Sequence, residues 1–182
     1  MKTYHYLFAA LFSLAACRKQ PQIPPAVVNE PENITSVRIT FTDSAGLEPA
    51  TTVSWSDADG AGGNNPIIES IQLKPNKTYF AELLIQDETK NPIVNVSAEI
   101  LKEGTDHQFF FTATGINVSI KPNDSDAKGN PIGLKSTWRT KSISSGSLRL
   151  VLKHQPGVKV ISPGDINAGS TDIDITYSSI IQ

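Results

Sequence analysis

Two loops of this 182-residue chain carry carboxylate side chains at a spacing that could hold a cation. The first runs from Asp57 to Asp59 and on through several glycines, and the second contains Asp124 and Asp126. Ca²⁺ takes several oxygen ligands from a tightly turning loop, although neither loop has the closing glutamate of an EF-hand. Asp, Asn and Gly are also the usual residues of exposed turns, so a Ca²⁺ site and an ordinary turn both fit the pattern.

Two histidines of the chain, His107 and His154, stand at the ends of alternating apolar stretches. His107 shares strand parity with Phe109 and Phe111, and His154 shares it with Leu152, so both rings are expected on the core-facing side. Neutral imidazole is a common ligand of transition metals. A half-buried, hydrogen-bonded histidine at the edge of the core would show the same pattern, so both interpretations stay open.

Strand direction predicts that these loops and histidines lie at one end of a sandwich. If consecutive strands alternate in direction, that end gathers seven side chains and a long loop over residues 155–171: Asp57, Asp59, Asp106, Asp124, Asp126, His107 and His154. Sandwiches usually bind their ligands with the loops at one end. One hypothesis is therefore a metal-capturing protein, and it requires Asp57 and Asp124 to lie at the same end.

Period-two alternation dominates the rest of the sequence and predicts about nine short strands. We expect them at residues 37–41, 51–55, 67–73, 78–86, 107–113, 117–121, 134–140, 148–153 and 172–181. Ile93, Val96, Ile100 and Leu101 instead have helical spacing and predict one short helix over 92–103, with Gly104 as a stop. The expected fold is an all-β, antiparallel, immunoglobulin-like sandwich.

The N-terminal residues predict an export signal. Lys2 precedes an apolar run over residues 6–14, which is shorter than the roughly 20 residues of a membrane span. The run ends in Leu14-Ala15-Ala16-Cys17, which resembles the lipobox of bacterial lipoproteins. We therefore expect a signal peptide over 1–16 and an acyl lipid such as palmitate on Cys17; an ordinary signal peptide with a chance cysteine is the alternative.

The segment 17–32 is rich in proline and predicts an extended tether ahead of a folded domain over 33–182. Arg18 follows the cysteine, and by resemblance to the sorting rules of bacterial lipoproteins a residue other than Asp there favours the outer membrane. The lack of an acidic cluster after Cys17 favours the periplasmic face. The expected partners are the membrane, through the lipid, and an outer-membrane protein.

Composition and motifs exclude several function classes. A net charge of −2 argues against nucleic-acid binding, and a single cysteine excludes intramolecular disulfides and multi-cysteine zinc sites. No sequence motif of a hydrolase, metalloprotease or phosphate-binding loop occurs, so we expect no enzyme and no resident cofactor, with Ca²⁺ or a transition metal as alternatives. Two further hypotheses are a glycan-binding platform of Trp55, Tyr79 and Trp138 and O-glycosylation of Ser44 in Asp43-Ser44-Ala45.

Several motifs of the chain resemble a family of small Bacteroidota lipoproteins with no established activity. They are residues 55–60, 107–110, 123–126, 129–134, 146–154 and 164–169, so the resemblance covers nearly the whole mature chain. Some members carry the label of a type 1 periplasmic binding fold, which has two α/β lobes, whereas this sequence predicts strands. The resemblance implies a lipid-anchored, non-catalytic binding or accessory module at the outer membrane.

Overall fold

The computed structural model describes residues 32–60, 62–160 and 164–182, which belong to the compact unit Pro31–Gln182. The predicted signal peptide, Cys17 and the Pro-rich segment up to residue 31 lie outside the described residues. Among the described residues are eleven strands and one helix, namely β1 (Ser36–Asp43), β2 (Thr51–Ser56), β3 (Ile67–Ile68), β4 (Ile71–Leu73), β5 (Thr78–Asp87), β6 (Val94–Asn95), α1 (Val96–Lys102), β7 (His107–Thr114), β8 (Val118–Pro122), β9 (Lys135–Thr140), β10 (Ser144–His154) and β11 (Ser170–Ile181).

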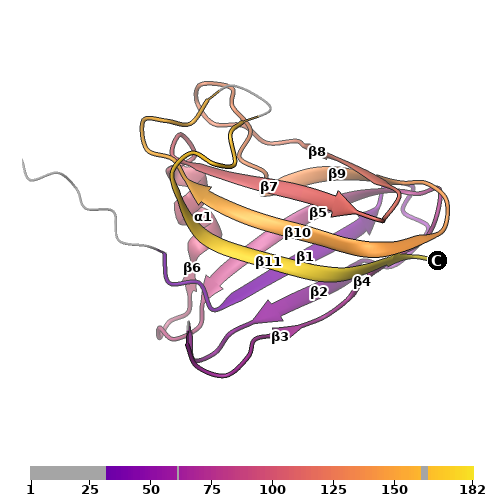
Figure 1. Cartoon of the computed structure of the whole chain (residues 1–182), viewed down its shortest axis with the longest axis horizontal. Helices are drawn as coiled ribbons and strands as arrows, with labels where there is room; N and C mark the ends of the chain where they lie inside the picture. Colours follow the sequence, from indigo (N-terminus) through magenta and orange to yellow (C-terminus); the bar gives the residue numbers. More distant parts are fainter. Residues whose placement is uncertain (1–31, 61, 161–163) are drawn as a thin grey trace, which may run out of the picture. The chain divides into compact units, whose positions relative to one another are not determined.

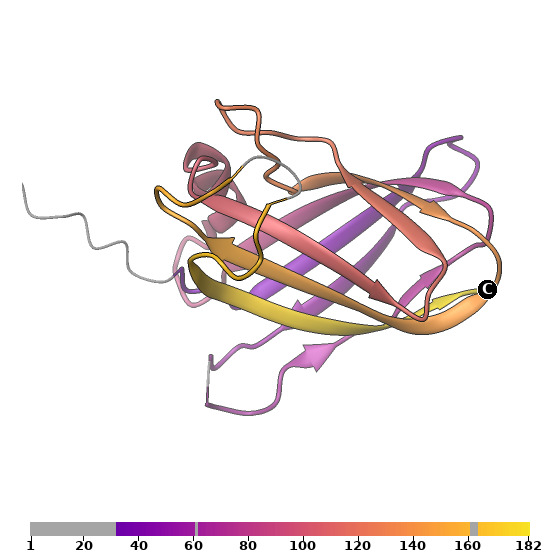
Figure 2. The ribbon, with the colours of Figure 1, turned by 45° about the horizontal axis from the view of Figure 1, so that its top comes forward.

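The strands form two sheets that lie face to face (Figures 1 and 2). The larger sheet has the order β3-β2-β1-β5-β9-β8, with β6 beside β5, and the smaller has the order β4-β11-β10-β7. Neighbouring strands are antiparallel, except that β4 runs parallel to β11. The predicted all-β sandwich with one short helix is confirmed, and every predicted strand is present.

Alternating apolar residues of the two sheets point inward and form the core. Strand β1 buries Val37, Ile39 and Phe41, and β10 buries every second residue from Leu148 to Leu152. Trp138 of β9 is fully buried at the centre and meets the rings of Phe41 and Phe111 edge to face, at centroid distances of 5.0 Å and 5.9 Å. The inner faces of both sheets therefore hold the fold together without any cross-link.

One predicted strand is divided between the two sheets. The apolar stretch at 67–73 forms β3 at the edge of the larger sheet and then β4 in the smaller one. Ile67 and Ile68 are exposed, whereas Ile71 and Leu73 are buried. Between them, the Glu69 side chain accepts hydrogen bonds from the backbone and hydroxyl of Ser54, which holds the chain where it leaves the first sheet. Alternation alone does not show where a chain changes sheets.

The helix is shorter than its apolar spacing predicted. Asn95 caps α1, because its side chain accepts a hydrogen bond from the Ala98 amide, and the helix spans Val96–Lys102. Val96 and Ile100 are buried against the core. Ile93 precedes the helix and is exposed. Leu101 is also exposed, because the residue after Ile100 points to a different side of the helix. The prediction that these two residues belong to the apolar face of the helix was wrong.

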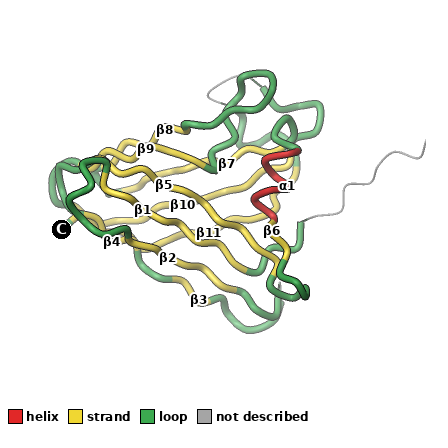
Figure 3. The backbone as a smooth tube through the Cα atoms, turned by 180° about the vertical axis from the view of Figure 1, so that it is seen from behind, coloured by secondary structure: helices red, strands yellow, loops and turns green. Residues whose placement is uncertain are grey.

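The two ends of the sandwich differ. Strands β2, β8 and β10 end, and β7 and β11 begin, at the end that also carries α1; we call it the loop end. The opposite end, which we call the turn end, carries the short connections after β1, β4, β7 and β9 and the C-terminus (Figure 3).

Replacing Ile100 and Leu101 separately tests which side of α1 faces the core. We expect Ile100→Ala to lower the free energy of unfolding by about 2–5 kcal/mol, because it leaves a cavity, and Leu101→Ala to cost less than about 1 kcal/mol. Urea unfolding followed by circular dichroism measures both. Equal losses for the two variants would contradict this packing.

Candidate functional site

The structure places the predicted site residues at the loop end, but not in one cluster. Asp57 and Asp124 both follow strands that end there, as the sequence hypothesis required. His107 and His154 lie opposite each other in the register of β7 and β10. Strand β2, however, lies three strands away from β9 in the larger sheet, so the two acidic loops occupy separate parts of the loop end (Figure 1).

The first acidic loop is closed by its own hydrogen bonds. The Asp59 carboxylate accepts from the backbone amide of Asn64 at 2.9 Å and from the Asn64 side chain at 2.6 Å. These two bonds hold the pKa of Asp59 below its ordinary value. Asp57 is tied to the start of the fold by its amide, which donates to the Thr35 carbonyl. Asp59 thus acts as a turn residue in this structure.

The second acidic loop is closed in the same way. The Asp124 carboxylate accepts from the amides of Gly133 at 2.8 Å and Lys135 at 3.2 Å. Asp126 Oδ1 accepts from the amides of Lys128 and Asn130. Backbone N–H groups therefore bond both oxygen atoms of Asp124 and Oδ1 of Asp126, and both carboxylates close the loop.

A buried lysine joins this loop to the histidines. Lys159 Nζ lies 3.0 Å from Asp126 Oδ2 and donates to the carbonyls of Gly104 at 2.6 Å and His107 at 2.9 Å. The Lys159 and Asp126 side chains are 1% and 0% exposed. Burial opposes the charged form of Asp126, but the amides and the ammonium outweigh it and hold the pKa of this carboxyl below its ordinary value. The ammonium thus has two carbonyl acceptors and one carboxylate countercharge.

The two histidines stack on each other. Their ring centroids are 4.9 Å apart and the rings are inclined by 30°. A metal lies in the plane of the imidazole that binds it, about 2.1 Å from the nitrogen. Stacked rings lie in separate planes, so one ion close to both rings would lie outside the plane of at least one of them. The backbone of Asp106 also lies near the histidines, because its carbonyl accepts a hydrogen bond from the amide of Gln155, the residue after His154.

His107 is the more buried of the pair, with no exposed surface. Its Nδ1 lies 3.3 Å from the Glu103 carbonyl, and because a carbonyl only accepts, Nδ1 carries the proton and Nε2 the lone pair. Nε2 makes no hydrogen bond with any described residue and lies 3.9 Å from Asp172 Oδ2, which also lacks a hydrogen-bond partner among them. Burial lowers the pKa of His107 and raises that of Asp172.

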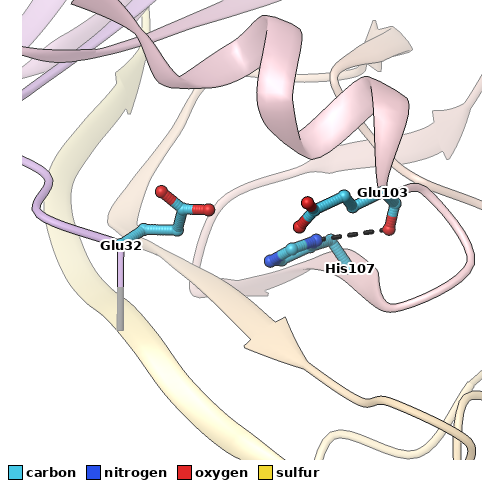
Figure 4. A group of neighbouring side chains, drawn as sticks. All are labelled: Glu32, Glu103 and His107. Carbon is cyan, nitrogen blue, oxygen red and sulfur yellow. Dashed lines mark hydrogen bonds between the residues drawn. The ribbon is translucent and has the colours of Figure 1, made fainter. Parts of the chain in front are cut away.

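Two glutamates complete an acidic cluster around this ring. One ring nitrogen of His107 and one carboxylate oxygen each of Glu32 and Glu103 lie within 4.8 Å of one another (Figure 4). It is the one such group of three among the residues that the structure describes. Burial, and then the charges of Glu99, Glu103 and Asp172, raise the pKa of Glu32.

Sequence reasoning identified His107 but missed its three acidic neighbours. Glu103 precedes His107 by four residues, which is a signal that could have been used. Glu32 was assigned to the Pro-rich segment. Asp172 reaches His107 because the register of β10 and β11 shifts between Leu152 and Lys153, and such a bulge redirects side chains in a way that alternation does not predict.

The remaining hypotheses are the glycan-binding platform and the glycosylation of Ser44. Trp55, Tyr79 and Trp138 are all buried, so the predicted glycan-binding platform was wrong: these aromatic rings belong to the core. Ser44 is exposed in the turn after β1, where Asp43 accepts hydrogen bonds from the turn amides. The structure leaves Ser44 accessible but does not test its glycosylation.

No protein-family model, curated protein or solved structure matches this chain. Among the described residues, no helix combines the length and hydropathy that a membrane crossing requires. The functional interpretation therefore depends on the residues of this chain alone.

Removing the buried lysine tests its structural role. We expect Lys159→Met to lower the free energy of unfolding by about 3–5 kcal/mol, because the carboxylate of Asp126 loses its countercharge in a buried place. Lys135→Met is the matched control: its ion pair with Glu82 is exposed, so stability should be nearly unchanged. Adding Asp126→Asn to Lys159→Met should recover part of the loss. Chemical denaturation measures all three, and equal stability of the two lysine variants would refute this role.

Proposed function

We propose that this protein is a non-catalytic lipoprotein, held at the periplasmic face of the outer membrane by a lipid on Cys17, where it acts as a binding or accessory module. One observation carries the proposal: an apolar run, Leu14-Ala15-Ala16 and the one cysteine of the chain follow each other in the order of a lipobox. The compact unit starts at Pro31, after a Pro-rich segment suited to an extended tether.

The position of Glu32 supports a role in which the folded unit presents its turn end to a partner. This first described residue lies at the loop end, so the tether joins the folded unit there (Figures 1 and 4). The turn end is the far end of a sandwich whose longest strand, β11, has 12 residues and spans about 40 Å. It presents the apolar side chains of Leu47 and Ile143, which are 77% and 73% exposed. In this proposal the turn end contacts an outer-membrane protein.

Lipid labelling tests the anchor. Cells that express the protein are fed an alkyne analogue of palmitate, and the immunoprecipitated protein is coupled to a fluorophore. We expect label in the wild-type protein and none in Cys17→Ser, because the thiol is the acylation point. Wild-type protein in the outer-membrane fraction that resists protease in intact cells supports the periplasmic face. Unlabelled wild-type protein, or label that persists in Cys17→Ser, contradicts the proposal.

Photo-crosslinking tests the contact. A photoreactive amino acid is placed at Ile143 on the turn end or, as the control, at Ile67, which has the same 73% exposure but lies on β3 toward the loop end. In intact cells we expect a discrete adduct with an outer-membrane protein from position 143 and none from position 67. Adducts of equal yield from both positions, or none from position 143, would count against this contact.

A further inference from the structure

We propose that His107, Glu103, Asp172 and Glu32 form a binding site for one divalent transition-metal ion such as Zn²⁺, with His107 Nε2 as its nitrogen ligand. This site does not depend on the lipid anchor. It differs from the metal hypothesis of the sequence, which used both histidines and the loop aspartates, because His107 is its one histidine and the acidic residues come from elsewhere.

The first argument is the orientation of His107. The bond from Nδ1 to the Glu103 carbonyl fixes the ring and its tautomer, as the outer hydrogen bond of metal-binding histidines usually does. It leaves the Nε2 lone pair buried and without a hydrogen-bond partner among the described residues. A buried acceptor with no partner costs free energy, and a metal ion would satisfy it.

The second argument is the gap between His107 and Asp172. The 3.9 Å from Nε2 to Oδ2 is too long for a hydrogen bond. Two ligand atoms bound about 2.0–2.2 Å from one Zn²⁺ stand roughly 3.3–3.6 Å apart on a tetrahedron. A shift of a few tenths of an ångström would therefore bring these two atoms to one ion. Glu32 and Glu103, whose group with His107 spans up to 4.8 Å and does not include Asp172, would move further to join it. The Asp172 side chain is only 4% exposed, so water does not solvate it freely.

The third argument is charge. Glu32, Glu103 and Asp172 bring three carboxyl groups to a ring that burial keeps neutral. Carboxylates that lie this close together in a buried place repel one another. A divalent cation offsets that repulsion. Imidazole favours Zn²⁺ and its neighbours in the first transition row over Ca²⁺ and Mg²⁺.

The ligands come from three separate parts of the chain: the segment before β1, the turn between α1 and β7, and β11. Glu32 precedes β1, Glu103 follows α1, His107 opens β7 and Asp172 lies at the bulge of β11 (Figure 4 shows the first three). The site is therefore formed only in the folded protein. A bound ion would fix the segment that precedes β1 to the smaller sheet, through β7 and β11, and to the end of α1.

Zn²⁺ titration of the full chain, extracted in detergent and stripped with EDTA, tests the proposal. We expect one Zn²⁺ per chain by calorimetry and a Zn²⁺-dependent rise of the melting temperature, since a ligand of the native state stabilises it. Ca²⁺ at the same concentration should have no comparable effect. The absence of a Zn²⁺-dependent shift, or an equal shift with Ca²⁺, would overturn the proposal.

Conservative variants locate the ion without removing the ring. Asp172→Asn and Glu103→Gln should each weaken Zn²⁺ binding by at least about 10-fold. Metal-free Asp172→Asn should melt at or above the wild-type temperature, because Asp172 Oδ2 is buried without a hydrogen-bond partner among the described residues and the substitution removes its charge. Two variants are controls: His154→Gln, which removes the ring stacked on His107, and Glu99→Gln, on α1. Both should keep wild-type affinity. Wild-type affinity in both Asp172→Asn and Glu103→Gln, or loss of binding in His154→Gln, would contradict the assignment.

Discussion

The buried ammonium of Lys159 is the interaction on which the loop end depends. A lysine side chain that is 1% exposed costs free energy unless its charge and all its protons have partners. Here Asp126 supplies the countercharge, and the carbonyls of Gly104 and His107 accept hydrogen bonds from the ammonium. One side chain thus joins the loop after β10, the loop after β8 and the start of β7. That is the part of the fold that holds the His107 ring.

Most of the fold could be predicted from alternation, because inward and outward residues of each strand differ in polarity. β1, β5 and β11 follow the pattern closely, whereas the first three residues of β7 and four consecutive residues of β10, Leu150 to Lys153, are buried. The pattern could not show that the chain changes sheets between Ile68 and Ile71, since both halves are apolar. It also predicted a wider apolar face for α1 than the structure has, because Leu101 fits helical spacing but lies on the solvent side.

The candidate site was predictable only at His107, whose parity with Phe109 and Phe111 placed it inside. Its acidic neighbours depend on tertiary structure: Glu32 lies far away in sequence, and Asp172 arrives through a shift of register. The acidic loops were the more conspicuous signal in the sequence. In the structure their carboxylates mostly accept backbone hydrogen bonds, as Asp does in turns. His107 Nε2, which is buried without a hydrogen-bond partner among the described residues, indicates the candidate site better than the aspartates of the two loops do.

X-ray absorption at the zinc edge, recorded on the Zn²⁺-loaded full chain, tests the central claim about His107 most directly. The account predicts a first shell of oxygen atoms with the multiple-scattering pattern of a single imidazole, at about 2.0–2.1 Å and without sulfur. In Asp172→Asn the shell should lose an oxygen or the ion should be lost. Two imidazoles in the first shell, or none, would contradict the account.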